Sequence, residues 1–277
     1  MTSPALQDII VLLGCPAAGN PAQYLFERAI TAARLDWRFL TVDVAPGRLE
    51  KALGGVEAMG FRGCLLAGPL EELALPLLAR MSPAARFASA ASLVEVQPEG
   101  AFGHMTEGRG IVEALRSHAD LAQARVLLVG AGVAGRAAAL ELSLAGVGTI
   151  AVADPDAAAA ARLVEAISAL DTTVAVEVLP CEGPIEVPEE TGIVIASRMA
   201  GQPPHRLAGL RPDLVVADTD LGSETSPVVA AARQAGCCVV DGIEIHVERA
   251  AIDFQCLTGM ETDPDMLREA LEEFLSA

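Results

Sequence analysis

Short apolar runs alternate with longer amphipathic stretches along almost the whole chain. In the first 108 residues, strands are expected at 9–13, 37–42, 63–67 and 92–97, and helices at 22–33 and 47–59. Prolines at 69, 76 and 83 keep any helix between them short. The run Gly100-Ala101-Phe102-Gly103 predicts a turn. An alternation of this kind is typical of an α/β fold.

The alternation becomes more regular after residue 108. Strands are expected at 125–129, 149–153, 174–178, 192–196, 214–217 and 238–240, and helices at 108–118, 133–145, 156–170 and 227–235. The Pro- and Glu-rich segment 181–190 predicts a surface connection, and the tail from residue 243 predicts helices, the last at 264–275. Six strands with intervening helices are what a doubly wound nucleotide-binding sheet requires.

A glycine-rich loop lies between the first strand and the first helix of this second alternation. It consists of Gly130, Ala131, Gly132, Val133, Ala134 and Gly135. In the strand–turn–helix setting predicted here, Gly-x-Gly-x-x-Gly is typical of a Rossmann dinucleotide site, because the helix N-terminus offers free N–H groups to a pyrophosphate. The alternative is a tight turn between strand and helix that binds no ligand.

An acidic residue, Asp154, follows the second strand of this sheet, close to the spacing that the motif expects. An acid at this point accepts hydrogen bonds from the adenosine ribose and repels a 2′-phosphate, which favours NAD and makes NADP the less favoured cofactor. Asp154 followed by Pro155 is also a good helix N-cap with proline at the first helical position. Both roles are open.

Net charge and cysteine usage narrow the range of partners. The formal net charge of −18 disfavours nucleic acid and anionic membranes as partners. The six cysteines contain no Cys-x-x-Cys pair, and the four histidines lack metal-ligand spacing, so we expect reduced thiols, no metal site and a cytoplasmic protein. No apolar run is long enough for a transmembrane helix. The sequence leaves a homodimer open.

The order of motifs resembles the shikimate dehydrogenase family over nearly the whole chain. Four stretches carry the resemblance: Gly60-Phe61-Arg62-Gly63, the run GHMTEGRG at 103–110, the run GAGVAGRA at 130–137, and Asp241-Gly242 leading to Ala250-Ala251. The resemblance implies two α/β domains: a substrate-side domain over 1–108, completed by a returning C-terminal segment 249–277, and a Rossmann domain over 109–248. It also implies a small-molecule substrate in the cleft between them.

The reactive side chains of that family are largely replaced. Glu71 stands where the family has the lysine that assists proton transfer, and Glu107 takes the place of the aspartate in its Asn-Thr-Asp-Gly run. Met105 takes the place of the asparagine in the same run. Leu65 and Ala67 likewise replace an asparagine and a threonine. The glycine scaffold is therefore kept while the substrate-binding set is altered.

Four further positions depart from the pattern. The segment that would hold a Ser-x-Ser pair is shortened and offers only Gly19 and Asn20. Ser92 stands near an expected asparagine, Arg249 near a substrate-binding glutamine, and Leu221 near a tyrosine. Arg249 is placed to meet either a substrate anion or Glu71. These positions make Asn20, Ser92, Met105 and Arg249 the substrate-side candidates.

Glu71 and Glu107 are the acid–base candidates that the sequence supports. If two carboxylates lie close, like-charge repulsion protonates one of them, so the pair would serve as an acid–base couple, hold a cation, or mark a site no longer in use. Arg62 and Arg109 would pair with these glutamates, bind a carboxylate or form surface salt bridges.

Two functions follow from these residues, and true shikimate dehydrogenase activity is a third hypothesis, against which the replacement of the family lysine by Glu71 counts directly. The first is an NAD-preferring oxidoreductase, of shikimate dehydrogenase type, that acts on a polar alcohol or ketone other than shikimate. The alternative is a dinucleotide-binding sensor or partner subunit without catalysis. The two differ in one property, hydride transfer.

Overall fold

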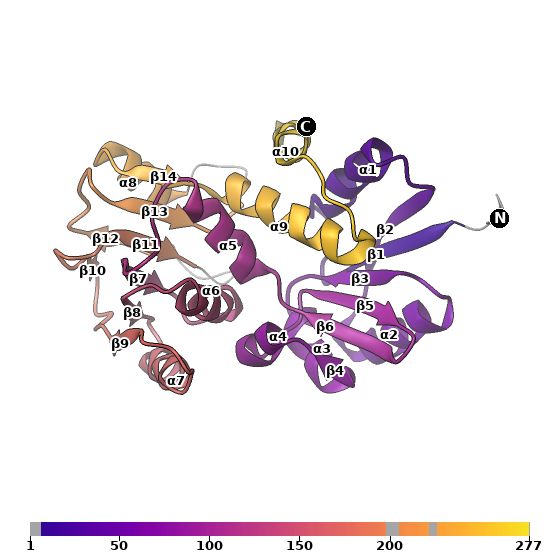
Figure 1. The fold of residues 1–277 in the computed structure, drawn as a ribbon, viewed down its shortest axis with the longest axis horizontal. Coiled ribbons are helices and arrows are strands. Elements are labelled where there is room, and N and C mark those ends of the chain that lie inside the picture. The colour runs from indigo at the N-terminus through magenta and orange to yellow at the C-terminus, as the bar shows by residue number, and fades with distance from the viewer. Residues whose placement is uncertain (1–6, 198–204, 222–225, 277) are drawn as a thin grey trace. The chain divides into compact units, whose positions relative to one another are not determined.

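The computed structural model describes residues 7–197, 205–221 and 226–276, which form two compact α/β units. Unit 1 contains the chain up to Thr106 and again from Arg249 onward, and unit 2 contains Glu107–Glu248. Each unit is built on a six-stranded sheet (Figure 1). The α/β fold class predicted from the alternation of apolar runs is confirmed.

The sheet of unit 1 is mixed, with strand order β2-β1-β3-β5-β6-β4. Its strands are β1 (Asp8–Gly14), β2 (Trp37–Asp43), β3 (Gly63–Leu66), β4 (Arg80–Met81), β5 (Leu93–Gln97) and β6 (Gly100–His104). The β1 strand pairs in parallel with β2 and β3, and β5 pairs antiparallel with β3 and β6. The central strands β1 and β3 are apolar because they are buried, β1 from Ile10 to Leu13 and β3 along its whole length, whereas the edge strand β2 is mostly exposed.

Two of the helices in unit 1, α1 and α9, meet the sheet at a small aromatic cluster. The helices of unit 1 are α1 (Ala22–Ala32), α2 (Leu49–Ala58), α3 (Leu70–Ala74), α4 (Pro83–Ala88) and α10 (Pro264–Ser276), with 3-10 turns η1 (Pro46–Arg48) and η2 (Leu75–Leu77). The long helix α9 (Gly242–Thr258) begins in unit 2 and ends in unit 1. Phe26 of α1 lies 4.9 Å from Phe39 of β2 and 5.9 Å from Phe254 of α9, ring centre to ring centre. These contacts attach the end of α9 to the core of unit 1.

The segment Gly100–His104 is a strand and not the turn that its two glycines predicted. It pairs antiparallel with β5, from Gln97 opposite Gly100 to Leu93 opposite His104. A Cβ atom at Gly103 would lie 2.5 Å from the side chain of Leu78. Gly103 is therefore required by close packing inside the sheet, and the expectation of a turn was wrong because glycine serves both purposes.

The sheet of unit 2 is all-parallel, with strand order β14-β13-β11-β7-β8-β9. Its strands are β7 (Arg125–Val129), β8 (Thr149–Ala153), β9 (Ala175–Val178), β11 (Ile193–Ala196), β13 (Val215–Asp218) and β14 (Cys238–Val240). The helices are α5 (Glu107–Arg116), α6 (Val133–Leu144), α7 (Ala157–Ser168) and α8 (Pro227–Gln234). This order is the doubly wound arrangement that the six apolar runs predicted, with β7 at the switch point.

Helices α5 and α6 approach each other closely at Gly108. A Cβ atom at Gly108 would lie 2.2 Å from the backbone oxygen of Ala137, so only glycine fits there. The same face carries Glu141, whose pKa is raised by burial and by Glu113, although the positive charge of Arg109 acts in the opposite direction. Arg109 therefore acts electrostatically on a carboxylate within unit 2.

The segment 181–190 is more than the surface connection that its prolines and glutamates indicated. Ile185 and Val187 are buried, and β10 (Ile185–Glu186) pairs in parallel with β12 (Leu207–Ala208). Both residues belong to the hydrophobic core cluster that also contains side chains of β7 and β11. Two apolar side chains in a polar run were enough to attach the segment to the sheet.

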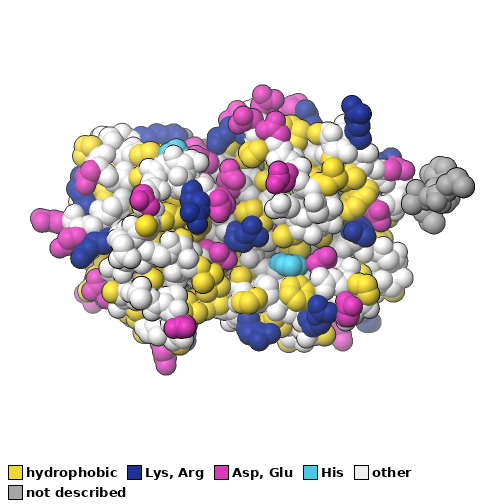
Figure 2. Space-filling model, viewed as in Figure 1, with side chains coloured by type: hydrophobic (Ala, Val, Ile, Leu, Met, Phe, Trp, Pro, Cys, Tyr) yellow, Lys and Arg dark blue, Asp and Glu magenta, His cyan; other side chains and the backbone are white. Residues whose placement is uncertain are grey.

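The distribution of charged side chains on the surface is consistent with the net negative charge of the chain. On the face shown in Figure 2, acidic and basic side chains are interspersed, and no continuous basic stripe crosses the described residues visible on that face. None of the described helices is both long enough and apolar enough to cross a bilayer.

Candidate functional site

The glycine loop of unit 2 begins where β7 ends and passes directly into α6. Gly130 has φ of +101°, and a Cβ atom there would lie 1.9 Å from the backbone oxygen of Ser197. A Cβ atom at Gly135 would lie 1.9 Å from the backbone oxygen of Gly130. Both glycines are therefore required sterically: the first by a left-handed backbone and a neighbouring strand end, the second by the close packing of loop and helix.

The N-terminus of α6 presents backbone donors of the kind that bind phosphate. Gly132 is its N-cap residue, and no side chain in the described ranges caps the helix there. The first N–H groups of a helix have no partner within the helix, and its dipole favours an anion. Val133, Ala134 and Gly135 form this first turn. The loop thus fits the pyrophosphate of a dinucleotide, a group that would be held by backbone donors without a cation.

Asp154 is bound to the glycine loop. Its Oδ2 accepts a hydrogen bond of 2.7 Å from the backbone N–H of Ala131, and its Oδ1 accepts one of 2.7 Å from the N–H of Asp156. Each carboxylate oxygen has a second lone pair, so the group retains acceptor capacity for a ribose hydroxyl. The carboxylate is held in place by the loop that would carry the phosphates.

The alternative role of Asp154 as a helix N-cap is wrong. The N-cap residue of α7 is Asp156, whose side chain accepts a hydrogen bond of 3.0 Å from the N–H of Ala158. Pro155 consequently lies before the helix and not at its first position. Asp154 and Asp156 are only two residues apart, so the sequence does not show which of them caps α7. The backbone geometry assigns the cap to Asp156 and leaves Asp154 to accept a hydrogen bond from the glycine loop.

In unit 1, Glu71 lies just beyond the carboxyl end of β3, in the short helix α3. Its backbone oxygen accepts a hydrogen bond from Ala91, and the N–H of the neighbouring Ala67 donates to Leu13 of β1. The Glu71 side chain is only 13% exposed. Glu71 is thus a mostly buried carboxylate with a fixed backbone at the end of a central strand.

Arg249 brings a positive charge to this carboxylate. Its Nη2 lies 3.6 Å from Glu71 Oε1, and its Nε lies 3.7 Å from Asp253 Oδ2, one helical turn further along α9. The side chains of Arg249 and Asp253 are 19% and 5% exposed. The sequence left two partners open for Arg249, a substrate anion and Glu71. In the structure Arg249 lies against Glu71.

A chain of hydrogen bonds continues from Asp253 into the core. Thr106 donates from Oγ1 to Asp253 Oδ1 at 2.5 Å, and its hydroxyl lies 3.0 Å from Ser92 Oγ. Ser92 Oγ also accepts from the Thr106 N–H at 3.1 Å, and Ser92 and Thr106 are both almost fully buried. Glu71, Arg249, Asp253, Thr106 and Ser92 form one connected group, called here the unit 1 polar cluster.

The other substrate-side candidates have simpler surroundings. Met105 is buried beside Thr106. Asn20 accepts a hydrogen bond of 2.9 Å from the N–H of Ala22 and so supports the start of α1. Leu221, the last described residue before a gap at 222–225, is partly exposed. Asn20 and Glu71 both follow the carboxyl ends of neighbouring parallel strands, β1 and β3.

Glu107 is the first residue of α5 and of unit 2, whereas Glu71 belongs to unit 1. The predicted pairing of these two carboxylates therefore stays a prediction. The guanidinium carbon of Arg62 lies 5.3 Å from the ring centre of Trp37, a cation–π contact within unit 1.

Sequence patterns did not single out Asp253 or the hydroxyl of Thr106. One signal was available: Arg249 and Asp253 are four residues apart, which places opposite charges on one face of a helix. The contact between Thr106 and Asp253 joins residues 147 positions apart. No local pattern predicts a contact over that separation.

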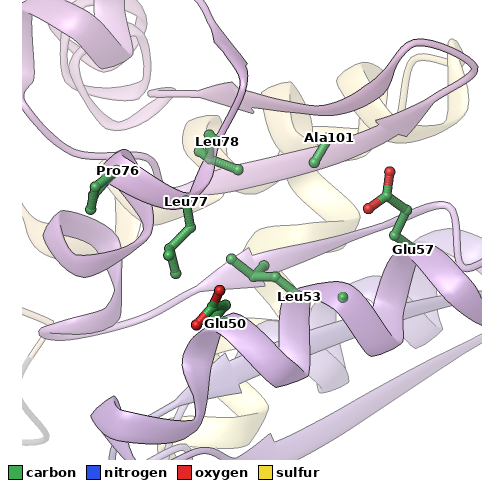
Figure 3. A pocket seen from close by; sticks show the side chains of 8 residues that line it. Glu50, Leu53, Glu57, Pro76, Leu77, Leu78 and Ala101 are labelled. Atoms are coloured by element: carbon green, nitrogen blue, oxygen red, sulfur yellow. The ribbon is translucent and has the colours of Figure 1, made fainter.

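A cavity of about 330 Å³ lies elsewhere in unit 1, between α2 and η2. Figure 3 shows Glu50 and Glu57 on either side of Leu53 on α2, with Leu77 and Leu78 across from them. None of the predicted site residues lines this cavity. Within the described ranges, no group of three or more His, Cys, Asp and Glu side chains is arranged to hold a metal ion.

No family model matches the chain. Comparisons with individual known proteins, however, find relatives that match over nearly its whole length. The shikimate dehydrogenase (NADP(+)) of Rubrobacter xylanophilus is 30% identical over 274 residues, which cover 95% of each protein. The ligand-free 5-ketofructose reductase of Gluconobacter sp. strain CHM43 is 28% identical, with a TM-score of 0.90 over 97% of this chain and 99% of that one.

A third comparison shows the same fold with ligands bound. The shikimate 5-dehydrogenase of Listeria monocytogenes, crystallised with shikimate and NAD, has a TM-score of 0.85 at 23% identity over 98% of this chain and 99% of that one. The glycine loop, the two α/β units and near full-length identity of 30% to a curated relative agree with one another. The chain belongs to the shikimate dehydrogenase family.

Proposed function

We propose that this protein is an NAD-preferring oxidoreductase that interconverts an uncharged polar alcohol and its ketone. The observation that carries the proposal is the Glu71–Arg249 ion pair, at a position where the resemblance to the family implies a lysine. Family membership supports the reaction class, and the glycine loop supports a dinucleotide. A nicotinamide dinucleotide would supply or accept the hydride.

An uncharged substrate fits the electrostatics of the unit 1 polar cluster. The guanidinium of Arg249 lies between two carboxylates, Glu71 and Asp253, so it offers no uncompensated positive charge to a substrate anion. A ketose or polyol needs hydrogen-bond donors and acceptors and no counter-ion. The 5-ketofructose reductase of Gluconobacter, named for such a ketone, has the same fold at 28% identity.

Two side chains of the unit 1 polar cluster would have different roles in the reaction. An arginine donates hydrogen bonds but does not release a proton at neutral pH, so Arg249 would bind and polarise an oxygen of the substrate. A carboxylate accepts a proton from a hydroxyl and returns it to the ketone in the reverse direction. Glu71, held beside Arg249, is our candidate for this proton transfer, and Glu107 is the second.

Turnover assays with both cofactors test this proposal. We expect reduction of uncharged ketoses and diketones with NADH, oxidation of the matching polyols with NAD, and much weaker activity with shikimate. Calorimetric binding of NAD without turnover of any ketose, polyol or hydroxy acid would instead support a non-catalytic dinucleotide-binding protein. Preferential turnover of shikimate would contradict the charge argument.

Cofactor preference depends on Asp154. In Asp154→Asn the amide oxygen still accepts from the Ala131 N–H, but the negative charge that repels a 2′-phosphate is lost. We expect the ratio of NADP to NAD affinity to rise at least about tenfold, since like charges near a surface repel by about 1–4 kcal/mol. Titration calorimetry with both cofactors measures this ratio.

Asp156→Asn is the matched control. It lies two residues away, removes the same charge and affects the cap of α7. An equal change of preference in both variants would show that net charge acts at long range and that Asp154 has no specific role.

A further inference from the structure

A cysteine, a histidine and a glutamate of unit 2 form a hydrogen-bonded chain that the proposed function does not use. His118 follows α5, Cys238 is the first residue of the edge strand β14, and Glu244 lies in the first turn of α9. His118 Nε2 lies 2.8 Å from Glu244 Oε1, and Cys238 Sγ lies 3.5 Å from His118 Nδ1. Cys238 is exposed to solvent.

The partners fix which nitrogen of His118 carries the proton. An ionised carboxylate only accepts, so Nε2 donates its N–H to Glu244. In the neutral imidazole the lone pair of Nδ1 then faces the thiol, which donates its S–H to it. A base that is in contact with a nucleophile, and is itself oriented by a third group, is the arrangement that activates a thiol.

Three other cysteines lie in less reactive surroundings. Burial raises the pKa of the fully buried Cys64 to about 12. Burial also raises the pKa values of Cys181 and Cys237. Cys237 adjoins Cys238, but its thiol donates to the backbone oxygen of Arg211 at 3.1 Å. Two neighbouring cysteines thus differ in their hydrogen-bond partners.

We propose that Cys238 is a nucleophilic modification site for soft carbon electrophiles of the α,β-unsaturated carbonyl class, with His118 as its base and Glu244 as the residue that positions His118. The sulfur of Cys238 forms a bond to the β-carbon while its proton passes to His118 Nδ1. The electron pair of the carbon–carbon double bond moves to the α-carbon, which takes that proton back from His118. The sum is addition of S–H across the double bond, without oxidant or leaving group.

The geometry distinguishes this cluster from a metal site and from the dinucleotide site. Cys238 and Glu244 lie on opposite nitrogens of one imidazole ring, so the three side chains do not converge on a common point. Cys238 pairs with Val215 at the amino end of the parallel strands, whereas Gly130 follows the carboxyl end of β7. Modification would therefore occur at the edge of the sheet opposite the glycine loop.

Labelling with N-ethylmaleimide, itself an α,β-unsaturated carbonyl compound, tests the proposal. The rate at each cysteine is followed by peptide mass spectrometry in the native full-length protein and in the unfolded protein in denaturant. We expect Cys238 to react at least about threefold faster in the native protein, because His118 accepts the thiol proton as the sulfur attacks. Cys237 and Cys64 are expected to react more slowly in the native protein than in the unfolded one.

Two variants distinguish activation of the Cys238 thiol by His118 from the effect of its solvent exposure alone. We expect His118→Gln to bring the native rate at Cys238 to or below its unfolded rate, and Glu244→Gln, which keeps an acceptor for Nε2–H but loses the charge, to give an intermediate rate. Cys64 stays unlabelled if these variants remain folded. A native rate at Cys238 no higher than its unfolded rate in the wild-type protein overturns the proposal, as does an unchanged rate in a folded His118→Gln variant.

Discussion

Replacing Arg249 by methionine is expected to lower the free energy of unfolding by about 3 kcal/mol, because it removes the cation that lies between two buried carboxylates. The side chains of Glu71 and Asp253 are 13% and 5% exposed, so water screens them poorly. Methionine keeps much of the length and the apolar stem of the arginine, which restricts the change mainly to charge. Urea unfolding followed by circular dichroism measures the difference.

Two further variants make the expectation specific. Arg249→Lys keeps the charge and should lose less stability, although it loses the planar arrangement of donors. In the double variant Glu71→Gln with Arg249→Gln, one negative and one positive charge disappear together, and we expect part of the lost stability to return. A double variant as unstable as the sum of its single changes would mean that the ion pair contributes no coupling.

The same pair bears on a lysine at position 71, which is the residue that the resemblance to the family implies there. Glu71→Lys alone would place two cations together, since Arg249 lies 3.6 Å from the Glu71 carboxylate. The two positions depend on each other, so a return toward the family pattern requires a neutral residue at 249 as well.

Replacing Gly135 by alanine is expected to reduce dinucleotide affinity on the order of 100-fold. Its Cβ atom would lie 1.9 Å from the backbone oxygen of Gly130, a distance that the loop can relieve only by moving away from α6. Moving the loop separates the donors of the α6 N-terminus from the phosphates, and hydrogen bonds to charged groups contribute about 1.5–3 kcal/mol each. Calorimetry with NAD measures the loss.

Gly54→Ala is the control for glycine replacement in a helix. Gly54 lies inside α2 and is exposed, and a Cβ atom there would have no neighbour within 4 Å. Alanine there should leave cofactor affinity unchanged and stabilise the protein by up to about 1 kcal/mol through helix propensity. Unchanged NAD affinity in Gly135→Ala would show that the tight turn is not needed for binding.

The parallel sheet of unit 2 was predictable from sequence because most of its strands are short apolar runs, and helices follow β7, β8 and β13. The mixed sheet of unit 1 was harder. Its strand β4 has only two residues, Arg80 and Met81, and β6 contains two glycines in five residues. Their pairing depends on neighbours across the sheet, and single-residue propensity carries no information about those neighbours.

The glycine loop was likewise predictable, since its residues are consecutive and its strand and helix are adjacent in sequence. The unit 1 polar cluster was predictable only in part. Glu71 and Arg249 stood out by comparison with family motifs, but Asp253 and the Thr106 hydroxyl joined them only through the fold. Side chains that converge from distant segments are a property of tertiary packing.

The hydrogen bond between Thr106 and Asp253 has a consequence for how such a chain can change over time. Thr106 is the last residue before the chain enters unit 2, and Arg249, one turn before Asp253, is the first after it returns. Unit 2 is thus inserted into unit 1, and the two points at which the chain leaves and re-enters unit 1 are joined by this hydrogen bond. The entropic cost of bringing two such points together rises only slowly with the length of the chain between them. Each unit has its own hydrophobic core, so substitutions in the core of one unit need not disturb the packing of the other.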